Sequence, residues 1–201
     1  MRPLQLSIKL PDWFAKSSDN HIRKVGQADE ARMGLAVELA HQNIAEGTGG
    51  PFAAIVVEET SGACVAAGVN VVVTSGLSIA HAEAVAIMLA QRQAGTFNLA
   101  AVSDQKYTLY TTGQPCIMCF GILWWSGITK LVCAARSDDI ESIAGFHEGP
   151  LGEDWQTLLA KRQHLPPIAV VHDVLREEAC DVLRKYTESG HPIYNPGPAD
   201  L

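Results

Sequence analysis

The chain has 201 residues, of which 47% are hydrophobic, and no low-complexity stretch or charge block divides it, so it can bury one substantial core. The formal net charge is −7 and the Lys and Arg residues are spread singly, which disfavours tRNA or single-stranded DNA as a partner. The sequence has no run of 18 apolar residues, no signal-peptide core and no secreted disulfide framework. We therefore expect a cytoplasmic protein that binds neither nucleic acid nor membrane.

The first half of the chain predicts a helix, a hairpin of two strands and a second helix. Apolar residues recur at helical spacing over residues 28–46, and Gly47 is a good C-terminal stop. Two apolar, β-rich runs follow over residues 51–59 and 63–73, and the short polar turn between them predicts an antiparallel hairpin. Residues 81–93 are rich in helix formers and predict the second helix.

The second half of the chain predicts three strands and two long helices. The strands are expected over residues 106–112, 129–135 and 167–173, and the helices over residues 116–125 and 174–188. Because residues 116–125 are almost wholly apolar, we expect this helix and the strand that follows it to be central and buried. Two short helical patterns, SDDIESIAG and EDWQTLLAKRQ, precede the last strand, and a connection of this length suits a crossover between parallel strands.

This order of elements predicts an α/β fold in three layers. A mixed five-stranded sheet, with its last two strands parallel, is expected to lie between helices on both faces. We divide the chain into an N-terminal extension of residues 1–26, a domain over residues 27–189 and a tail over residues 190–201. The tail is too rich in Pro and Gly for regular structure.

Two predicted helix starts carry residues suited to metal chemistry. His81 opens one helix and Cys116 opens the next, so both helix N-termini are expected to converge at one end of the sheet. Cys116 and Cys119 are three residues apart, so both can reach one metal ion, and the helix N-terminus favours their thiolate form. Two thiolates and a neutral imidazole balance the charge of Zn²⁺ and leave a fourth position for water, which is the catalytic arrangement. We predict one zinc ion per chain, held by His81, Cys116 and Cys119.

Glu83 is the predicted general base. It lies two residues beyond His81, so it need not bind the metal. Beside a zinc-bound water of lowered pKa, its carboxylate can take the proton of the attacking water and return it to a ring nitrogen and the departing amine. The set is the H-x-E…P-C-x-x-C signature of zinc deaminases. A C-x-x-C pair without the His81 motif would be equally typical of a buried or redox pair.

Seven runs in this order, GGPFAA, AAGVN, AHAEA, PCIMCFG, WWSG, CAARSDD and GFHEGP, resemble bacterial guanine deaminases of the cytidine deaminase-like, zinc-dependent deaminase superfamily. The similarity spans about residues 28–150, with a weaker match in HPIYN, and includes the branch of these enzymes that also accepts ammeline-type triazines. It implies a cytidine deaminase-like fold, a homodimer and the hydrolysis of guanine to xanthine and ammonia through a tetrahedral intermediate at C2.

The resemblance also implies roles for residues outside the zinc motif. Glu148 would be a second catalytic acid, and Asn70 would hydrogen-bond the purine. Phe52 and Trp125 would line the ring pocket, and Tyr194 of the tail would close over the bound purine from the same or a neighbouring subunit. Hydrolytic deamination must protonate a ring nitrogen, deprotonate the attacking water and protonate the leaving amine. A second carboxylate on the far side of the amine can bind the amino hydrogens and assist the departure of the amine.

The sequence is compatible with several alternatives. Gln114 stands where the superfamily commonly has Glu, and His147 stands where relatives often have Asp, so the ring that is deaminated could be ammeline, cytosine or a purine nucleoside. A tRNA deaminase is disfavoured by the acidic charge. A catalytically inactive interaction module that is stabilised by zinc is disfavoured, because the sequence retains the general base Glu83 and leaves one zinc coordination position open. Without the resemblance to this family, Glu148 would be interpreted as a solvated carboxylate in a loop and Asn70 as a turn residue. The tail would be interpreted as a frayed chain end.

Overall fold

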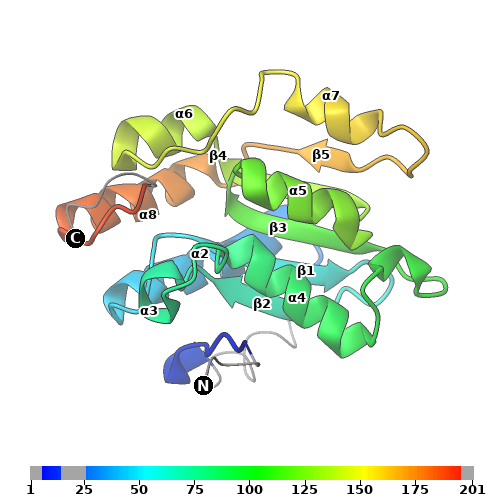
Figure 1. The fold of residues 1–201 in the computed structure, drawn as a ribbon, viewed down its shortest axis with the longest axis horizontal. Helices are drawn as coiled ribbons and strands as arrows, with labels where there is room; N and C mark the ends of the chain where they lie inside the picture. Colours follow the sequence, from blue (N-terminus) through cyan, green and yellow to red (C-terminus); the bar gives the residue numbers. More distant parts are fainter. Residues whose placement is uncertain (1–5, 15–25, 196–201) are drawn as a thin grey trace.

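A mixed sheet forms the centre of the protein (Figure 1), whose computed structural model describes residues 6–14 and 26–195. The strands are β1 (Ala53–Glu58), β2 (Cys64–Val69), β3 (Tyr107–Gly113), β4 (Lys130–Ala135) and β5 (Ala169–Val171). Their order across the sheet is β2-β1-β3-β4-β5. β1 pairs antiparallel with β2 and β3, whereas β3–β4 and β4–β5 are parallel pairs. The predicted five-stranded sheet with its last two strands parallel is confirmed.

Four long helices cover the two faces of this sheet. α2 (Asp29–Ala45) and α8 (Arg176–Glu188) pack on one face, and α4 (Ala82–Ala94) and α5 (Ile117–Ser126) lie side by side on the other (Figure 1). Successive side chains of a strand point to opposite faces, so in β1 Ile55 belongs to the first core and Val56 to the second. The predicted three-layer α/β/α arrangement is confirmed.

Shorter helical segments connect these elements. They are α3 (Val72–Ser75), the 3₁₀ turn η1 (Leu99–Ala101), α6 (Ser137–Asp139), the π-helical turn η2 (Ile140–Ala144) and α7 (Trp155–Ala160). α6, η2 and α7 form the predicted crossover between the parallel strands β4 and β5. Within the described ranges, none of the helices combines the length and apolar character needed to cross a membrane.

The first departure from the predicted elements follows β2. The strand predicted over residues 63–73 ends at Val69, and α3 begins three residues later. The cause is local, because Asn70 Oδ1 accepts a hydrogen bond from the backbone N–H of Val72 at 3.2 Å and so turns the chain out of the sheet. The turn leaves Asn70 beside Phe52, whose carbonyl accepts the Asn70 backbone N–H at 3.0 Å.

The second departure concerns α5, which is less buried than predicted. Only Cys119, Leu123 and Ser126 of this helix are buried, whereas Trp125 is 75% exposed and Ile117 is 45% exposed. α5 lies in an outer layer and therefore turns only one side to the sheet. The prediction of a buried helix is wrong, and that of a buried β4 is confirmed.

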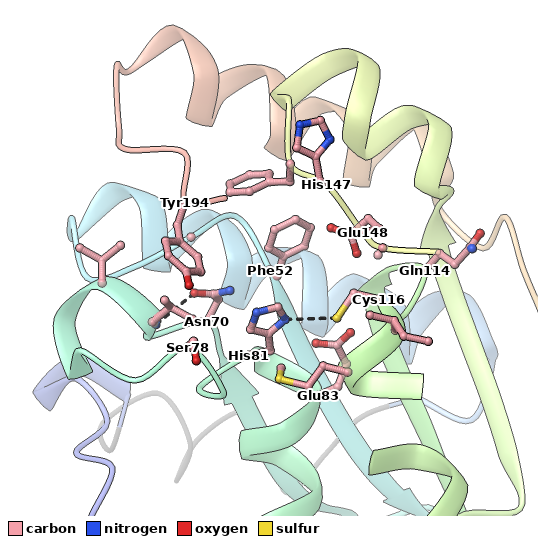
Figure 2. A pocket seen from close by; sticks show the side chains of 18 of the residues that line it. Phe52, Asn70, Ser78, His81, Glu83, Gln114, Cys116, His147, Glu148 and Tyr194 are labelled. Atoms are coloured by element: carbon pink, nitrogen blue, oxygen red, sulfur yellow. Dashed lines mark hydrogen bonds between the residues drawn. The ribbon is translucent and has the colours of Figure 1, made fainter. Parts of the chain in front are cut away.

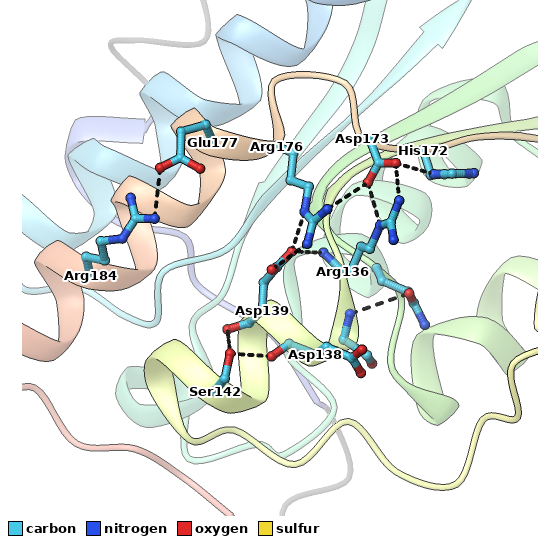
Figure 3. A network of polar contacts seen from close by, with 11 residues as sticks. Arg136, Asp138, Asp139, Ser142, His172, Asp173, Arg176, Glu177 and Arg184 are labelled. Carbon is cyan, nitrogen blue, oxygen red and sulfur yellow. Dashed lines mark hydrogen bonds and ion pairs between the residues drawn. The ribbon is translucent and has the colours of Figure 1, made fainter.

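Two ion pairs hold the start of α6 against the turn before α8 (Figure 3). Arg136 donates two hydrogen bonds to Asp173, at 2.7 and 2.6 Å, and Arg176 donates two to Asp139, both at 2.7 Å. Asp139 also accepts the backbone N–H of Arg136 at 2.9 Å. Asp173 and Leu175 have φ values of +67° and +53°, which non-glycine residues adopt rarely. The ion pairs thus hold a turn that the backbone alone disfavours.

Replacing Asp139 is expected to destabilise this junction. Asp139→Asn should lower the free energy of unfolding by about 1–2 kcal/mol near pH 7, because charge-assisted hydrogen bonds become neutral ones. The Arg176 guanidinium, above all, holds the pKa of Asp139 below its ordinary value of 3.8. The stabilisation is therefore complete above that pH and is lost as the pH falls toward the folded-state pKa. Urea unfolding of both proteins measures it, and an undiminished difference at about pH 3 would contradict the assignment.

Part of the predicted N-terminal extension packs on the domain. Phe14 is buried and belongs to the core cluster that includes α2, and its ring makes an edge contact with Trp13, with centroids 5.5 Å apart. The Trp13 indole N–H donates to Thr48 Oγ1 at 3.0 Å. Residues 1–5 and 15–25 of the extension, and residues 196–201 of the tail, lie outside the described residues.

Candidate active site

The predicted metal ligands meet at the N-termini of α4 and α5. His81 and Cys116 are each the residue immediately before a helix, and Cys119 lies in the first turn of α5. The ligand atoms of the three side chains all lie within 4.8 Å of one another, and His81 Nδ1 is 3.6 Å from Cys116 Sγ (Figure 2). Imidazole nitrogen and thiolate sulfur are the ligand atoms that zinc prefers. These three side chains therefore fit a zinc site with three protein ligands.

A glycine in β2 allows α4 to reach this position. Gly68 lies beneath the first turns of the helix, where a Cβ atom would be 2.4 Å from the Ala82 carbonyl oxygen and 2.6 Å from the Ala86 backbone nitrogen. A larger residue would push α4 away from the sheet and separate His81 from Cys116. The close approach of strand and helix therefore determines the distance between the ligands.

The surroundings of the two thiols favour a thiolate. The Cys119 thiol donates to Cys116 Sγ, and this bond, assisted by His81, lowers the pKa of Cys116 to about 4. The same bond raises the pKa of Cys119, because its proton is held beside the negative sulfur. Cys116 is thus negative at neutral pH, and binding of a divalent cation would displace the proton of Cys119.

Glu83 lies in the first turn of α4, and its side chain points into the same cavity as Cys116 (Figure 2). It is only 7% exposed. Burial, with a further contribution from the negative Cys116, raises the pKa of Glu83 to about 7. A buried carboxylate next to a metal site and open to a cavity is typical of a general acid or base.

Glu148 reaches the cavity from the loop that follows η2 (Figure 2). Its backbone carbonyl accepts the N–H of Ile117 at 3.0 Å, so the loop lies directly on the N-terminus of α5. Gly149 makes this contact possible, because its φ is +87° and a Cβ atom there would be 2.6 Å from Ile117 Cγ2. Burial, followed by the negative charges of Cys116 and Glu83, raises the pKa of Glu148 to about 8. Glu148 is thus a half-buried cavity residue and not a solvated loop carboxylate.

The cavity next to these residues has a volume of about 360 Å³, which suits a small heterocycle. Phe52 and Phe146 form an aromatic wall, with ring centroids 5.4 Å apart and an interplanar angle of 65°. Asn70 lines the opposite part of the cavity after β2, and Tyr194 extends toward it from the tail (Figure 2). The predicted residues Phe52, Asn70, Glu83, Glu148 and Tyr194 therefore lie around one cavity, together with His81 and Cys116.

The tail is fixed to the loop that carries Glu148. Asn195 Nδ2 donates to the Gly145 carbonyl at 2.8 Å, and Asn195 Oδ1 accepts the backbone N–H of His147 at 2.8 Å. The Tyr186 hydroxyl donates to the Pro192 carbonyl at 2.6 Å. Residues 191–195 thus contact the cavity of their own chain.

Trp125 is not among the residues that line the cavity of its own chain, so its role in the ring pocket stays a prediction. It lies near the C-terminus of α5, at the far end of the helix from Cys116, and three quarters of its side chain is exposed. The neighbouring Trp124 packs against Phe120 and the Arg162 guanidinium, also away from the site. The aromatic wall comes instead from Phe146, which lies in the run GFHE.

The two residues that depart from the family pattern have structural contacts. Gln114 lines the cavity, and its Oε1 accepts the backbone N–H of Ser137 at 3.4 Å, at the start of α6. His147 is exposed, and its backbone rather than its ring makes the contact with Asn195. Val73 and Ser78 also line the cavity. The sequence gives Val73 no such role because residues 63–73 predict a continuous strand, and it carries no signal for Ser78.

A His-Cys-Cys metal site beside a buried glutamate, at the helix N-termini of a mixed α/β/α sheet, defines a zinc-dependent deaminase. Residues 26–135 match the family model of the cytidine and deoxycytidylate deaminase zinc-binding region. The chain belongs to this family, which confirms the predicted superfamily and its zinc cofactor.

Relatives of the chain include guanine deaminases. That of Bacillus subtilis (strain 168) is 38% identical over 113 residues, which are 56% of this chain and 67% of the relative. The solved structure of a guanine deaminase from Nitrosomonas europaea is 44% identical and has a TM-score of 0.85, with 94% of this chain and 99% of that chain covered. Another solved structure, in complex with 2,6-diaminopurine, is 46% identical and also has a TM-score of 0.85. The match covers 94% of this chain and 96% of that chain.

The donor set predicts the metal content of the purified protein. We expect about one zinc ion per chain, because the described residues provide one cluster of three ligand side chains. Cys119→Ser should remove most of the zinc, whereas Cys133→Ser, at a buried cysteine that is no part of the cluster, should retain it. Elemental analysis measures both, and an active protein without zinc would contradict the prediction.

Proposed function

We propose that the protein hydrolyses the C2 amino group of guanine and so produces xanthine and ammonia. The observation that carries this proposal is that Glu83 and Glu148 line the same cavity as the zinc ligands, so two carboxylates are available for proton transfer. The similarity to guanine deaminases over 94% of the chain supports a purine substrate. The complex of a relative with 2,6-diaminopurine supports it further, because that purine also carries an amine at C2.

In this proposal, His81, Cys116 and Cys119 would hold a zinc ion, which when bound would lower the pKa of a water molecule toward neutral pH. Glu83 takes the proton from the attacking water and delivers it to the ring nitrogen next to C2. Because Glu83 is buried, its carboxylate is largely shielded from bulk water during this transfer.

Glu148 and Asn70 act on the other edges of the ring. The Glu148 carboxylate binds the hydrogens of the amine and then assists its departure as ammonia. Asn70 Oδ1 is already held by the Val72 N–H, so Asn70 presents its Nδ2 donor to the substrate. Purine O6 and N7 are both acceptors and match this donor. Phe52 supports a flat heterocycle by contact with its face.

We further propose that Tyr194 closes over the bound purine, and that residues 27–189 form the catalytic domain. Deleting residues 190–201 should lower kcat/KM by about ten-fold or more and leave the melting temperature within a few degrees, because the tail excludes water from the cavity. A matched truncation after Asn195, which keeps Tyr194 and the two hydrogen bonds of Asn195, should retain activity. Unchanged kinetics of the longer deletion would make the tail a frayed end.

The substrate assignment is tested by ammonia release from guanine, ammeline, cytosine, adenine and guanosine with zinc-loaded protein. We expect kcat/KM for guanine to exceed that for each other compound by about ten-fold or more. A preference for another ring would replace guanine as the substrate. If no compound releases ammonia, the zinc-stabilised interaction module becomes the better interpretation.

We also propose that the protein is a cytoplasmic homodimer that does not bind nucleic acid. Trp125, Ile117 and Met88 are exposed apolar residues on α4 and α5, and a second copy would cover them. All five cysteines are free thiols, which suits a reducing compartment. The net charge of −7 opposes binding to a polyanion. Light scattering measures the mass in solution, and a monomer at micromolar concentration would reject the dimer.

A further inference from the structure

A buried asparagine lies directly behind the cavity residue Asn70. Asn43, in the last turn of α2, is fully buried. Its Nδ2 donates to the Asn70 carbonyl at 2.9 Å and to the Gly50 carbonyl at 2.8 Å. Both of these residues line the cavity. One side-chain amide therefore holds together the two backbone segments that meet at this wall of the cavity.

The loop that contains Gly49 and Gly50 packs too closely against Asn70 to move independently of it. At Gly49, a Cβ atom would lie 1.8 Å from the Asn70 carbonyl oxygen and 2.9 Å from Asn43 Nδ2. At Gly50, it would lie 3.2 Å from the Asn70 side-chain carbonyl carbon. The loop is thus packed against both the backbone and the side chain of Asn70, and a shift of the loop must move the Asn70 amide.

The orientation of the Asn43 amide is fixed by a chain of hydrogen bonds from the N-terminal segment. The Trp13 indole can only donate, and it donates to Thr48 Oγ1 at 3.0 Å. The Thr48 hydroxyl then has its own hydrogen for Asn43 Oδ1, which is 2.8 Å away. With Oδ1 used in this way, the Asn43 NH₂ group faces the two carbonyls, which can only accept. The Asn43 carbonyl, at 3.3 Å, is a second and longer acceptor for the Thr48 hydroxyl. The shorter contact to Oδ1, together with the two carbonyls that face Nδ2, fixes the orientation of the Asn43 amide.

We propose that Asn43 is a positioning residue for the substrate-binding amide of Asn70, and that Trp13 and Thr48 hold Asn43 in the required orientation. This inference rests on the proposed role of Asn70 in binding the purine. It also gives residues 6–14 a function, because Trp13 is the first donor in the chain of hydrogen bonds. Trp13, Thr48 and Asn43 need not touch the substrate, since they act through the backbone of residues 50 and 70.

Thr48→Val and Trp13→Phe test the inference, because each removes one hydrogen-bonding group and retains most of the side-chain shape. Asn43→Ala is less suitable, since a cavity and two unsatisfied carbonyls in a buried place can prevent folding. We expect each variant to raise KM for guanine and Kd for xanthine by about two- to ten-fold, the effect of one weakened hydrogen bond. We expect kcat to change less than KM, because binding geometry rather than proton transfer is disturbed.

Thr129→Val is the control, because Thr129 is also partly buried and its hydroxyl also donates a hydrogen bond, in this case to the backbone carbonyl of Tyr107 at 3.2 Å. This contact lies at the end of β3 remote from the cavity. A loss of thermal stability similar to that of Thr48→Val, with unchanged KM and Kd, is the expected result for a contact that is merely structural.

A double-mutant cycle separates this inference from the proposed function. In the Asn70→Ala background, Thr48→Val should cause no further rise in the Kd for xanthine, because the group that it positions is absent. If Asn70→Ala weakens binding and Thr48→Val does not, the inference is overturned while the role of Asn70 stands. Equal effects of Thr48→Val in both backgrounds would overturn it as well. If Asn70→Ala leaves the Kd unchanged, the proposed role of Asn70 fails and the inference fails with it.

Discussion

Glu83→Gln is expected to retain zinc and to lower turnover of guanine by roughly 10²–10⁴-fold or more. The amide has nearly the same size as the carboxylate but cannot take the proton of the attacking water. The three zinc ligands are unchanged, so the metal content should remain that of the wild type. Steady-state ammonia release and elemental analysis on the same preparation measure the two quantities together.

Glu178→Gln is the matched control for this experiment, because Glu178 lies exposed in the first turn of α8 and is not among the residues that line the cavity. Removing its charge should leave turnover unchanged. Near-normal turnover of Glu83→Gln would reject Glu83 as the proton shuttle. Loss of zinc together with activity would instead show that the carboxylate supports the metal site, and not the proton transfer alone.

Glu148→Gln is expected to lower guanine deamination by about ten-fold to 10³-fold without loss of zinc. The effect should be smaller than that of Glu83→Gln, because Glu83 can still carry every proton in turn. It should also depend on the substrate. The amine at C2 of guanine lies between two ring nitrogens, and a carboxylate on its far side can hold the amino hydrogens.

Cytosine is the comparison substrate for the Glu148 variant. If cytosine is turned over at all, its rate should fall less than that of guanine, since the proposed contact depends on the purine geometry. Equal losses for the two substrates would make Glu148 a structural residue, consistent with its backbone contact to Ile117. No loss for guanine would exclude a part for Glu148 in the reaction.

The metal site could be predicted from the sequence because its determinants are local. The two cysteines are one helical turn apart, and His81 and Cys116 each directly precede a helix that follows a strand. Such spacings fix which side chains share a face before any tertiary contact is known. The parallel pairing of β3 and β4 then brings both helix N-termini to the same end of the sheet.

The parts that could not be predicted depend on tertiary contacts. The rotation of α5 about its axis decides that Trp125 faces solvent, and an almost wholly apolar helix carries no pattern that reveals this rotation. The Asx turn at Asn70, which ends β2, competes with a strand-like apolar run. The bond from Trp13 to Thr48 joins residues 35 positions apart, and no periodic signal links them.

The reaction itself is tested most directly with guanine in ¹⁸O-labelled water and the zinc-loaded wild-type protein. We expect xanthine that carries one ¹⁸O atom, formed together with one equivalent of ammonia, because water replaces the amine at C2 in a single hydrolysis. Mass spectrometry of the purine and an ammonia assay of the same sample measure both products. Recovery of unchanged guanine, or of a purine product without the label, would contradict the proposal that this protein is a hydrolytic guanine deaminase.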